Sequence, residues 1–299
     1  MKTVFCIDDN PRYLLLLKAA VRSLRALHGD GAPLLCVYGG EDEAVMAEVA
    51  SERIPLAHYR PRLNRQTMPA FTHPMIGCFL RLELALVPEL ADDDAVLYCD
   101  SDTFFLRPLD ALFTAPVPAY LGMVREATAP FYHEHEKLAY DFRERRYTVA
   151  MPFPIWTYSS AVTLFNLARF RRRDLVEHFL AFSQQNVQYI GNLDQSLLNY
   201  FFGKRITRLD DCWNRPPYQA DCLDTAHIVH FHGPKPWEIS KPWPGDELRI
   251  NCFREMRRRW YELLSKKERE LAESWDGRGP GAGQAGNFFP APHEKTQLS

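Results

Sequence analysis

The chain has 299 residues, of which 46% are hydrophobic and 25% are charged. This composition supports a substantial buried core, and it excludes a chain that is disordered throughout. With 36 basic and 38 acidic residues, the formal net charge of −2 gives no overall reason to expect a nucleic-acid partner.

Apolar runs and amphipathic stretches alternate in the first part of the chain. A strand is predicted over residues 3–7 and, after a polar turn, a helix in which apolar residues recur every three or four positions. Further strands are predicted at 34–38 and near 56–59, with a helix-like stretch at 41–51 between them. This alternation predicts an α/β fold in which helices cover a mostly parallel sheet.

The later part of the chain is less regular. A helix is predicted near 74–88, followed by a strand over the apolar run that begins at Val96. Residues 125–158 are rich in Pro, His, Tyr and charge, and we interpret them as an elaborated loop near the functional site with one helix over 134–145. Beyond it, strands are predicted at 159–166 and 225–231, and helices at 171–184, 193–202 and 252–275.

The seven cysteines are scattered, mostly within apolar runs, and form no C-x-x-C pair. They are typical of reduced, buried thiols in a cytosolic protein. The apolar run at 3–7 is too short for a signal peptide, and no stretch of the sequence approaches the roughly 18 apolar residues of a membrane span. We therefore expect a cytoplasmic protein that is not an integral membrane protein.

Two carboxylates, Asp100 and Asp102, lie one residue apart where an apolar strand ends, with Ser101 between them. Carboxylate oxygens suit hard cations such as Mg²⁺ and Mn²⁺, which commonly bind one or two protein carboxylates together with the phosphates of a substrate. Ligands of open α/β sheets gather at the carboxyl ends of strands, where Asp8 is also expected. The pair therefore predicts a metal site for a phosphate-bearing substrate; the alternative is a surface turn with solvated acids.

Three segments together resemble glycosyltransferase family 8, a group of nucleotide-sugar transferases. They are Asp8-Asp9-Asn10, Asp100-Ser101-Asp102 and residues 230–237, and they occur in the family's order. Residues 80–90, 194–199 and 211–214 also resemble family segments, so the likeness runs from about residue 4 to 243. It implies a GT-A fold, with a mixed, mostly parallel sheet flanked by helices. We expect a GT-A-like catalytic domain at 1–247, a basic amphipathic helical appendage at 248–275 and a disordered tail at 276–299.

The resemblance implies a metal-dependent, retaining hexosyltransferase that uses a UDP-sugar, with UDP-glucose or UDP-galactose favoured. Mn²⁺ or Mg²⁺ would be held by Asp100, Asp102 and His230. The nucleotide-sugar would be bound by Asp8, Asn10, Arg81, Asp100, Ser101, Gly233 and Lys235, and the catalytic candidates near the anomeric carbon are Asp194 and Gln195. The leaving diphosphate gains negative charge, which a metal ion stabilises as a Lewis acid and a lysine as a point charge.

Two departures from the family pattern keep alternatives open. The run Tyr158-Ser159-Ser160-Ala161 stands where the family usually has F-N-[AS]-G, and the late motif is one residue shorter between Gly233 and Lys235. A non-catalytic nucleotide-sugar-binding protein is therefore one alternative. The run Asp100-Ser101-Asp102-Thr103 also fits the nucleophile motif of haloacid-dehalogenase-like phosphatases, which makes a metal-dependent phosphatase another. One of Asp9 and Asn10 is also expected to cap the helix that follows.

The C-terminal helix interleaves six basic residues, between 254 and 267, with aromatic and aliphatic ones. Such a helix is usually a solvated face of a domain. The alternative is an interfacial helix that makes peripheral contact with anionic lipid through residues 252–267. That contact would suit a glycan or glycolipid acceptor, as in polysaccharide or lipopolysaccharide biosynthesis, at the inner face of a membrane.

Overall fold

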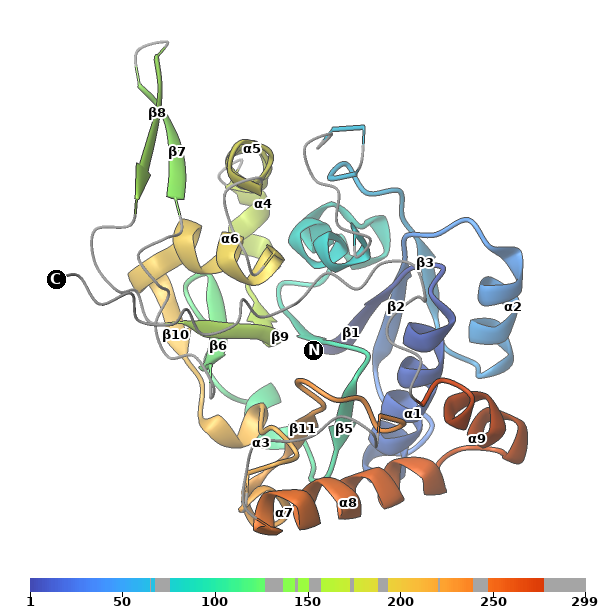
Figure 1. Ribbon diagram of the computed structural model, residues 1–299. Helices are drawn as coiled ribbons and strands as arrows, with labels where there is room; N and C mark the ends of the chain where they lie inside the picture. Colours follow the sequence, from blue (N-terminus) through green and yellow to red (C-terminus); the bar gives the residue numbers. More distant parts are fainter. Residues whose placement is uncertain are drawn as a thin grey trace, which may run out of the picture.

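A computed structural model describes residues 1–64, 66–67, 76–126, 137–142, 145–150, 157–172, 175–187, 193–219, 221–238 and 247–276, with only the backbone of 137–142, 145–150 and 247–250. A seven-stranded sheet crosses the molecule in the order β10-β6-β9-β4-β1-β2-β3 (Figure 1). Its strands are β1 (Lys2–Ile7), β2 (Leu34–Tyr38), β3 (Leu56–His58), β4 (Val96–Cys99), β6 (Leu121–Arg125), β9 (Tyr158–Phe165) and β10 (Ile206–Arg208). Only β9 runs antiparallel to its neighbours, β4 and β6. The predicted mixed, mostly parallel sheet is confirmed.

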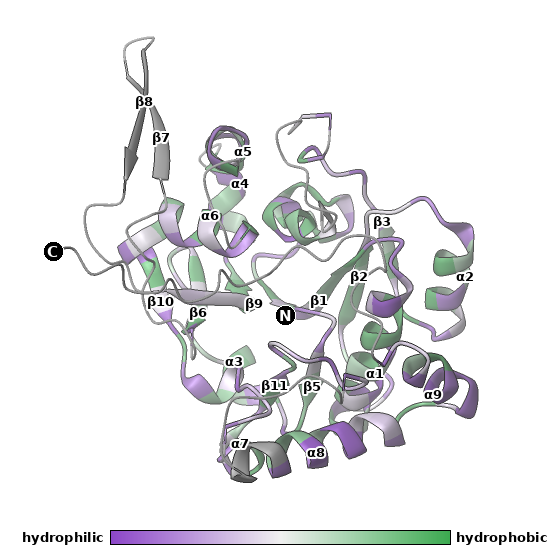
Figure 2. Cartoon of the chain, viewed as in Figure 1, coloured by the Kyte–Doolittle hydropathy of each residue, from purple (hydrophilic) through white to green (hydrophobic). Residues whose placement is uncertain are grey.

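Helices cover both faces of the sheet. The α-helices are α1 (Pro11–His28), α2 (Glu43–Ser51), α3 (Asp110–Phe113), α4 (Leu167–Arg172), α5 (Leu175–Asn186), α6 (Leu193–Phe202), α7 (Cys222–Thr225), α8 (Glu247–Glu262) and α9 (Lys266–Glu273). The 3₁₀ helices are η1 (Ile76–Leu86), η2 (Pro88–Leu90), η4 (Gly203–Arg205) and η5 (Asp211–Trp213). One hydrophobic cluster joins the sheet to η1 and α4–α6, and another joins it to α1–α3. Buried on both sides, the parallel strands β2 (LLCVY) and β4 (VLYC) are continuous apolar runs, as expected for such strands. Green segments gather around β2 in Figure 2.

Two small antiparallel sheets complete the described part of the chain. Strand β5 (Thr103–Phe105) pairs with β11 (Ile228–His230), and this pairing brings the late motif beside the acidic pair. Strand β7 (Lys137–Phe142) pairs with β8 (Arg145–Ala150) in a hairpin that projects from the body (Figure 1). The helix predicted over 134–145 is therefore wrong, because apolar residues at positions 138, 140 and 142 have the period of a strand. The rest of the predicted loop lies outside the described residues.

The C-terminal segment forms two helices, because Ser265 caps α9 in a reciprocal capping box with Glu268. Phe253, Met256 and Trp260 of α8 are at most 5% exposed and belong to a cluster that also contains residues of α1 and β11. These apolar side chains pack on the α/β body and do not face solvent. Eight basic and seven acidic residues lie in 247–276, so charge is nearly balanced there. A contact with anionic lipid stays a prediction, and in this arrangement it would depend on charged side chains alone.

Among the described residues, no helix combines the length and the apolar composition that a membrane span requires. The tail predicted to be disordered lies, beyond Asp276, outside the described residues.

Candidate functional site

The acidic pair occupies a tight turn between β4 and β5. The amide of Asp100 donates to the carbonyl of Ala161 (2.7 Å), and the amide of Thr103 donates back to the carbonyl of Asp100 (3.2 Å). On the other side of the turn, the amide of Phe231 donates to the carbonyl of Asp102 (2.9 Å). Backbone hydrogen bonds to β9 and to the end of β11 therefore fix the position of both carboxylates.

Asp100, Asp102 and His230 form a cluster that could hold a metal ion. The Nε2 atom of His230 lies 3.4 Å from Oδ1 of Asp102 and 4.0 Å from Oδ2 of Asp100. One ligand atom of each residue lies within 4.8 Å of the others, and among the described residues no other group of three His, Cys, Asp or Glu meets this condition. Two carboxylates and one imidazole suit Mn²⁺ or Mg²⁺, with coordination positions left for substrate oxygens. The structure therefore brings together all three predicted ligands.

Lys235 reaches the same cluster from the loop after β11. Its Nζ atom lies 2.5 Å from Oδ2 of Asp102 and donates to the carbonyl of Phe231 at 3.0 Å. Burial alone would raise the pKa of the Asp102 carboxyl, but the charge of Lys235 and the neighbouring His230 hold it well below its usual range. Asp102 is therefore an anion placed between a cation and an imidazole. The shorter spacing of the late motif does not keep Lys235 from the cluster.

Arg81 links Asp100 to the first turn of α6. Its Nη2 atom lies 2.7 Å from Oδ1 of Asp100, and its guanidinium lies 4.5 Å from the ring centroid of Tyr98. The hydroxyl of Tyr98 also donates to Asp100. Because this side of Asp100 is occupied by two donors, its other oxygen is the one left facing His230. Arg81 and Tyr98 thus orient a predicted metal ligand.

Asp194 lies on the far side of Arg81, and its Oδ2 atom is 3.3 Å from Nε. That Nε donates its hydrogen to the carbonyl of Cys78 (3.0 Å), so Arg81 pairs with Asp194 through charge. The Oδ2 atom of Asp194 is buried and accepts no hydrogen bond from the described residues. Burial raises the pKa of the Asp194 carboxyl, and the charge of Arg81 opposes this. An unsatisfied buried carboxylate oxygen is costly, and such groups are often found at functional sites.

Side chains of α6 hold the start of β9. The amide of Ser160 donates to Oε1 of Gln195 (3.2 Å), and Asn199 pairs with both backbone groups of Tyr158 (2.8 Å each). Ser159, which replaces the family's Asn, accepts from the amide of Ala161 at 3.4 Å and is only 4% exposed. The hydroxyl of Ser159 therefore faces its own strand. Gln195 is placed beside the segment that departs from the family pattern.

Asp8 and Asn10 follow β1, and each has a local hydrogen-bond role. Oδ1 of Asn10 caps α1 by accepting from the amide of Arg12 (3.0 Å), so the expectation that one of Asp9 and Asn10 caps this helix is confirmed. Asp9 instead accepts from the amides of Glu41 and Asp42, which holds the loop after β2. Burial raises the pKa of the Asp8 carboxyl, which accepts from the amide of Asn10 (3.1 Å). The side-chain nitrogen of Asn10 has no hydrogen-bond partner among the described residues.

A cavity of about 110 Å³ joins these groups. It is lined by Cys6, Ile7, Asp8, Tyr13, Gly77, Cys78, Arg81, Asp100, Ser101, Asp102 and Lys235. Six of the residues predicted to bind the nucleotide-sugar or the metal are thus on its wall, and His230 adjoins it through Asp102. Asp194 and Gln195 do not line the cavity; they contact Arg81 and Ser160 respectively. Gly233, at φ 94°, lies at the turn of the loop that carries Lys235. Glycine tolerates this backbone conformation without strain.

Tyr13 is a wall residue that the sequence patterns did not indicate. It lies in the first turns of α1, and burial is the main cause that raises the pKa of its hydroxyl, with the charge of Asp8 next. An aromatic ring one helical turn after Asp8-Asp9-Asn10 was the available signal, but within an amphipathic helix it is indistinguishable from a core residue.

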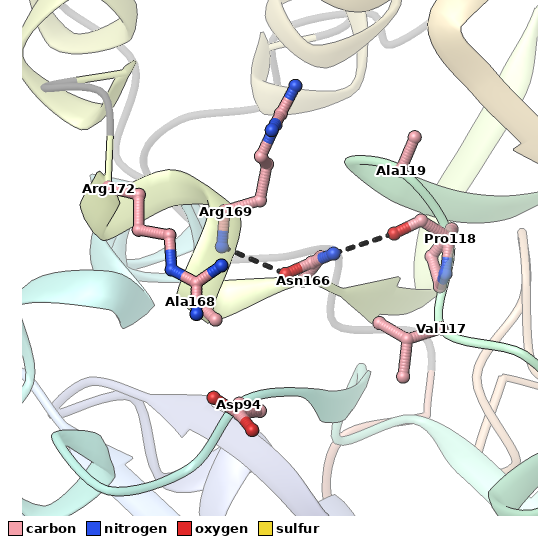
Figure 3. A pocket seen from close by; sticks show the side chains of 8 residues that line it. All are labelled: Asp94, Val117, Pro118, Ala119, Asn166, Ala168, Arg169 and Arg172. Atoms are coloured by element: carbon pink, nitrogen blue, oxygen red, sulfur yellow. Dashed lines mark hydrogen bonds between the residues drawn. The ribbon is translucent and has the colours of Figure 1, made fainter.

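A larger cavity of about 510 Å³ lies elsewhere (Figure 3). Its wall is formed by Asp94, Val117, Pro118, Ala119, Asn166, Ala168, Arg169 and Arg172. Asp94 precedes β4 and residues 117–119 precede β6, so this cavity opens at the end of the sheet opposite to the acidic pair. None of the motif residues lines it. The volume of a cavity therefore does not identify the candidate functional site in this protein.

Comparison with known proteins gives a consistent result. The sequence model of glycosyl transferase family 8 matches residues 62–241. Similar solved structures include the galactosyltransferase LgtC with donor and acceptor sugar analogs, which has a TM-score of 0.66 at 21% identity over 90% of this chain and 99% of that one. A second is the bifunctional glycosyltransferase WbbM, with a TM-score of 0.59 at 15% identity over 88% and 51% of the two chains.

A third is the glycosyltransferase GlyE of Streptococcus pneumoniae TIGR4, with a TM-score of 0.57 at 17% identity over 92% and 62% of the two chains. At these identities the structures establish the GT-A fold alone. No curated protein sequence matches the chain. The family model, however, covers more than half of the 299 residues. The chain therefore belongs to glycosyltransferase family 8 and is a glycosyltransferase of GT-A fold.

Proposed function

We propose that this glycosyltransferase moves a hexose from a UDP-sugar, UDP-glucose or UDP-galactose, to a glycan or glycolipid acceptor with retention of configuration, and that it depends on Mn²⁺ or Mg²⁺. One observation carries the proposal. The cluster of Asp100, Asp102 and His230 adjoins a cavity whose wall also contains Lys235 and Asp8. Such a site offers oxygen and nitrogen ligands for a cation, a point charge for phosphate, and an acceptor for nucleoside hydroxyl or amide groups.

The donor set fits a divalent cation. Asp100, Asp102 and His230 would hold it, and Asp102 is an anion in its surroundings. When bound, the metal would act as a Lewis acid that stabilises the charge developing on the leaving diphosphate. Arg81 and Tyr98 keep Asp100 in one orientation, so the cluster does not need to reorganise when a cation binds.

Lys235 would bind the diphosphate. Its ammonium is held between Asp102 and the carbonyl of Phe231, with the side chain 27% exposed. A phosphate oxygen that reaches Lys235 would therefore meet a cation whose position is already fixed. A fixed cation stabilises a transition state more than a mobile cation does. Asp8, which lines the same cavity as Lys235, would accept a hydrogen bond from the nucleoside.

Asp194 and Gln195 remain the catalytic candidates. The burial of Asp194 supports a role in stabilising positive charge at the anomeric carbon, because a carboxylate in a low-dielectric site interacts strongly with a nearby cation; Arg81 already pairs with it from one side. Gln195 fixes Ser160 through its carbonyl oxygen and keeps its amide nitrogen for a sugar hydroxyl. Arg81 stands between Asp194 and Asp100 and so connects the two halves of the site.

The acceptor would enter beside the insertion between β6 and β9, which starts and ends at the same edge of the sheet as the acidic pair. We place the enzyme in the cytoplasm, at or near the inner face of a membrane that carries the acceptor. A second candidate function is nucleotide-sugar binding without transfer. It is favoured by one observation, the hydroxyl of Ser159 that faces its own strand where the family has an Asn.

A thermal-shift screen of nucleotide sugars, with and without Mn²⁺, tests the proposal. Ligand at 100 times its Kd stabilises a protein by about 2.7 kcal/mol, which is easily measured. We expect UDP and one UDP-hexose to raise the melting temperature in the presence of Mn²⁺, and sugar transfer to disappear in Asp102→Ala. No UDP-dependent shift would contradict the proposal. Binding of the UDP-sugar without transfer to any glycan acceptor would favour the second candidate.

A further inference from the structure

The loop that carries Lys235 has two neighbours. On one side it meets the site, where Lys235 Nζ lies 2.5 Å from Asp102. On the other side it meets α8, which runs beside β11 and β5 in Figure 1. The position of a cation that must meet a diphosphate is therefore set partly by a helix outside the sheet.

Within the loop, short hydrogen bonds fix the backbone around Lys235. Its amide donates to Oε2 of Glu238 (3.0 Å), and its carbonyl accepts from the amide of Glu238 (2.9 Å). Prolines on both sides restrict the backbone further. Because these constraints link the backbone of Lys235 to that of its neighbours, a contact to Pro236 constrains Lys235 as well.

Arg257 of α8 makes such a contact. Its Nε–H donates to the carbonyl of Pro236 at 2.8 Å, and its guanidinium lies 4.6 Å from the ring centroid of Tyr261. The stacked ring holds the guanidinium plane, so the donor is preorganised. This hydrogen bond attaches one residue of the loop to a helix that is itself well anchored.

Aromatic packing provides that anchor. Trp237 is 1% exposed and lies 5.9 Å from Trp260 of α8 and 5.0 Å from Trp275, measured between ring centroids. Phe231 meets Phe253 of α8 edge to face at 6.3 Å. The loop is thus held at both ends by aromatic pairs and at Pro236 by a hydrogen bond. The aromatic packing supplies most of the stability of the contact between the loop and α8. The directional hydrogen bond from Arg257 fixes how the loop is positioned along the helix.

We propose that Arg257 is a positioning residue for Lys235: by binding the carbonyl of Pro236, it holds the lysine ammonium where the diphosphate of the donor must lie. This assignment rests on the proposed function, because it is the UDP-sugar that Lys235 would meet. It gives the C-terminal helices a role in donor binding, although none of their residues lines the cavity.

A double-mutant cycle on UDP binding tests the proposal, with titration calorimetry of the full chain in Mn²⁺. The four proteins are the wild type, Arg257→Met, Lys235→Met and the double variant. Arg257→Met should weaken UDP binding about three- to tenfold, the worth of one hydrogen bond, but only while Lys235 is present. Arg257→Lys should restore part of the affinity, since its ammonium can also donate to Pro236.

The matched control is Arg258→Met, one residue along α8, where the side chain bonds Glu255 and Glu262 and not the loop. It should bind UDP like the wild type. Equal weakening by Arg257→Met in both Lys235 backgrounds would mean a merely structural role and would overturn the proposal, as would a wild-type affinity in Arg257→Met.

Hydrogen exchange gives a readout that needs no ligand. Amides of 231–238 should exchange faster in Arg257→Met than in Arg258→Met, while those of β4 stay unchanged; equal exchange in the loop would count against the positioning role. If the wild type does not bind UDP, the proposed function fails, and the exchange measurement still decides whether Arg257 holds the loop.

Discussion

Two charge networks in this protein use similar side chains in different surroundings. The Arg81 network lies under the cavity and consists of Arg81, Tyr98, Asp100 and Asp194. The α9 network joins α1, α2 and α9 near the surface and consists of Lys18, Arg22, Glu48, Glu52 and Glu268. In the Arg81 network the side chains of Arg81 and Asp194 are each 8% exposed. In the α9 network exposure rises from 12% at Glu268 to 54% at Glu48, so that network grades from largely buried to solvated.

Exposure decides what each network contributes. Burial removes the hydration of charged groups, and the attraction between them offsets this free-energy cost only in part. A buried network therefore adds little net stability, but it is costly to break. Pairs nearer the surface are screened by solvent and salt, so they contribute modestly and cost less to break. The Arg81 network is therefore explained by orientation of Asp100 and Asp194, and the α9 network by docking of a helix. The same comparison predicts a ranking of substitutions.

The largest effect is expected from Arg81→Met, because it leaves two carboxylates buried without their cation. Breaking a buried pair in this way typically costs about 3–5 kcal/mol of unfolding free energy. Urea unfolding followed by circular dichroism measures it. Arg62→Met, which removes a pair to Glu177 with both side chains about half exposed, is the control and should cost less than about 1 kcal/mol. Equal losses in the two variants would break the comparison.

Tyr98→Phe should act on metal affinity more than on stability. It removes the hydroxyl that donates to Asp100 and leaves the ring that packs under Arg81. Loss of a partner that orients a metal ligand typically weakens metal binding about 10- to 100-fold. Titration calorimetry with Mn²⁺ gives the affinity, and the melting temperature without metal gives the control. A large drop in melting temperature with unchanged Mn²⁺ affinity would show that Tyr98 serves only the core.

Glu268→Gln tests the α9 network and its dependence on pH. Burial alone would raise the pKa of Glu268, but Arg22 and the capping contacts of Ser265 lower it from 4.5 to about 2. Since the folded pKa is depressed, the stability from Glu268 is fully present above pH 4.5 and is lost as pH falls towards 2. Because the Glu268 side chain is only 12% exposed, we expect Gln to cost about 1–3 kcal/mol at pH 6, more than a surface pair would.

Urea unfolding of the wild type and Glu268→Gln between pH 2 and 6 measures this difference. It should shrink towards the acid end, and it should also shrink in 1 M salt, where the Debye length is about 3 Å. A difference that is independent of pH and salt would mean that packing of α9, and not its charge, holds the helix.

The sequence indicated the residues with a local signature and missed those that depend on packing. Asp100, Asp102 and His230 stand in recognisable motifs, and the structure brings them together. The contact of Tyr98 with Asp100 and the bond of Arg257 to Pro236 have no such signature. Each depends on which strand or helix lies alongside, and periodicity does not specify that.

The C-terminal helices show the same limit. Their apolar residues recur with a helical period, which predicts a buried face but not what covers it. A lipid surface and the body of the protein fit the pattern equally well. In the structure that face packs against residues of α1 and β11, among others. The strand alternation at 137–142 and 145–150 is likewise hard to recognise in the sequence, because charged residues interrupt it.

The smallest effect is expected from Arg258→Met, which extends the comparison to a fully solvated pair. Arg258 pairs with Glu255, one turn before it on α8, and with Glu262, one turn after it. Its side chain is 57% exposed. Ordering two long side chains offsets most of the attraction in such a pair, so the melting temperature should stay within experimental error at low and high salt. A loss as large as that of Glu268→Gln would mean that exposure does not rank these networks. Pairing along α8 would then stabilise the helix that holds the Lys235 loop.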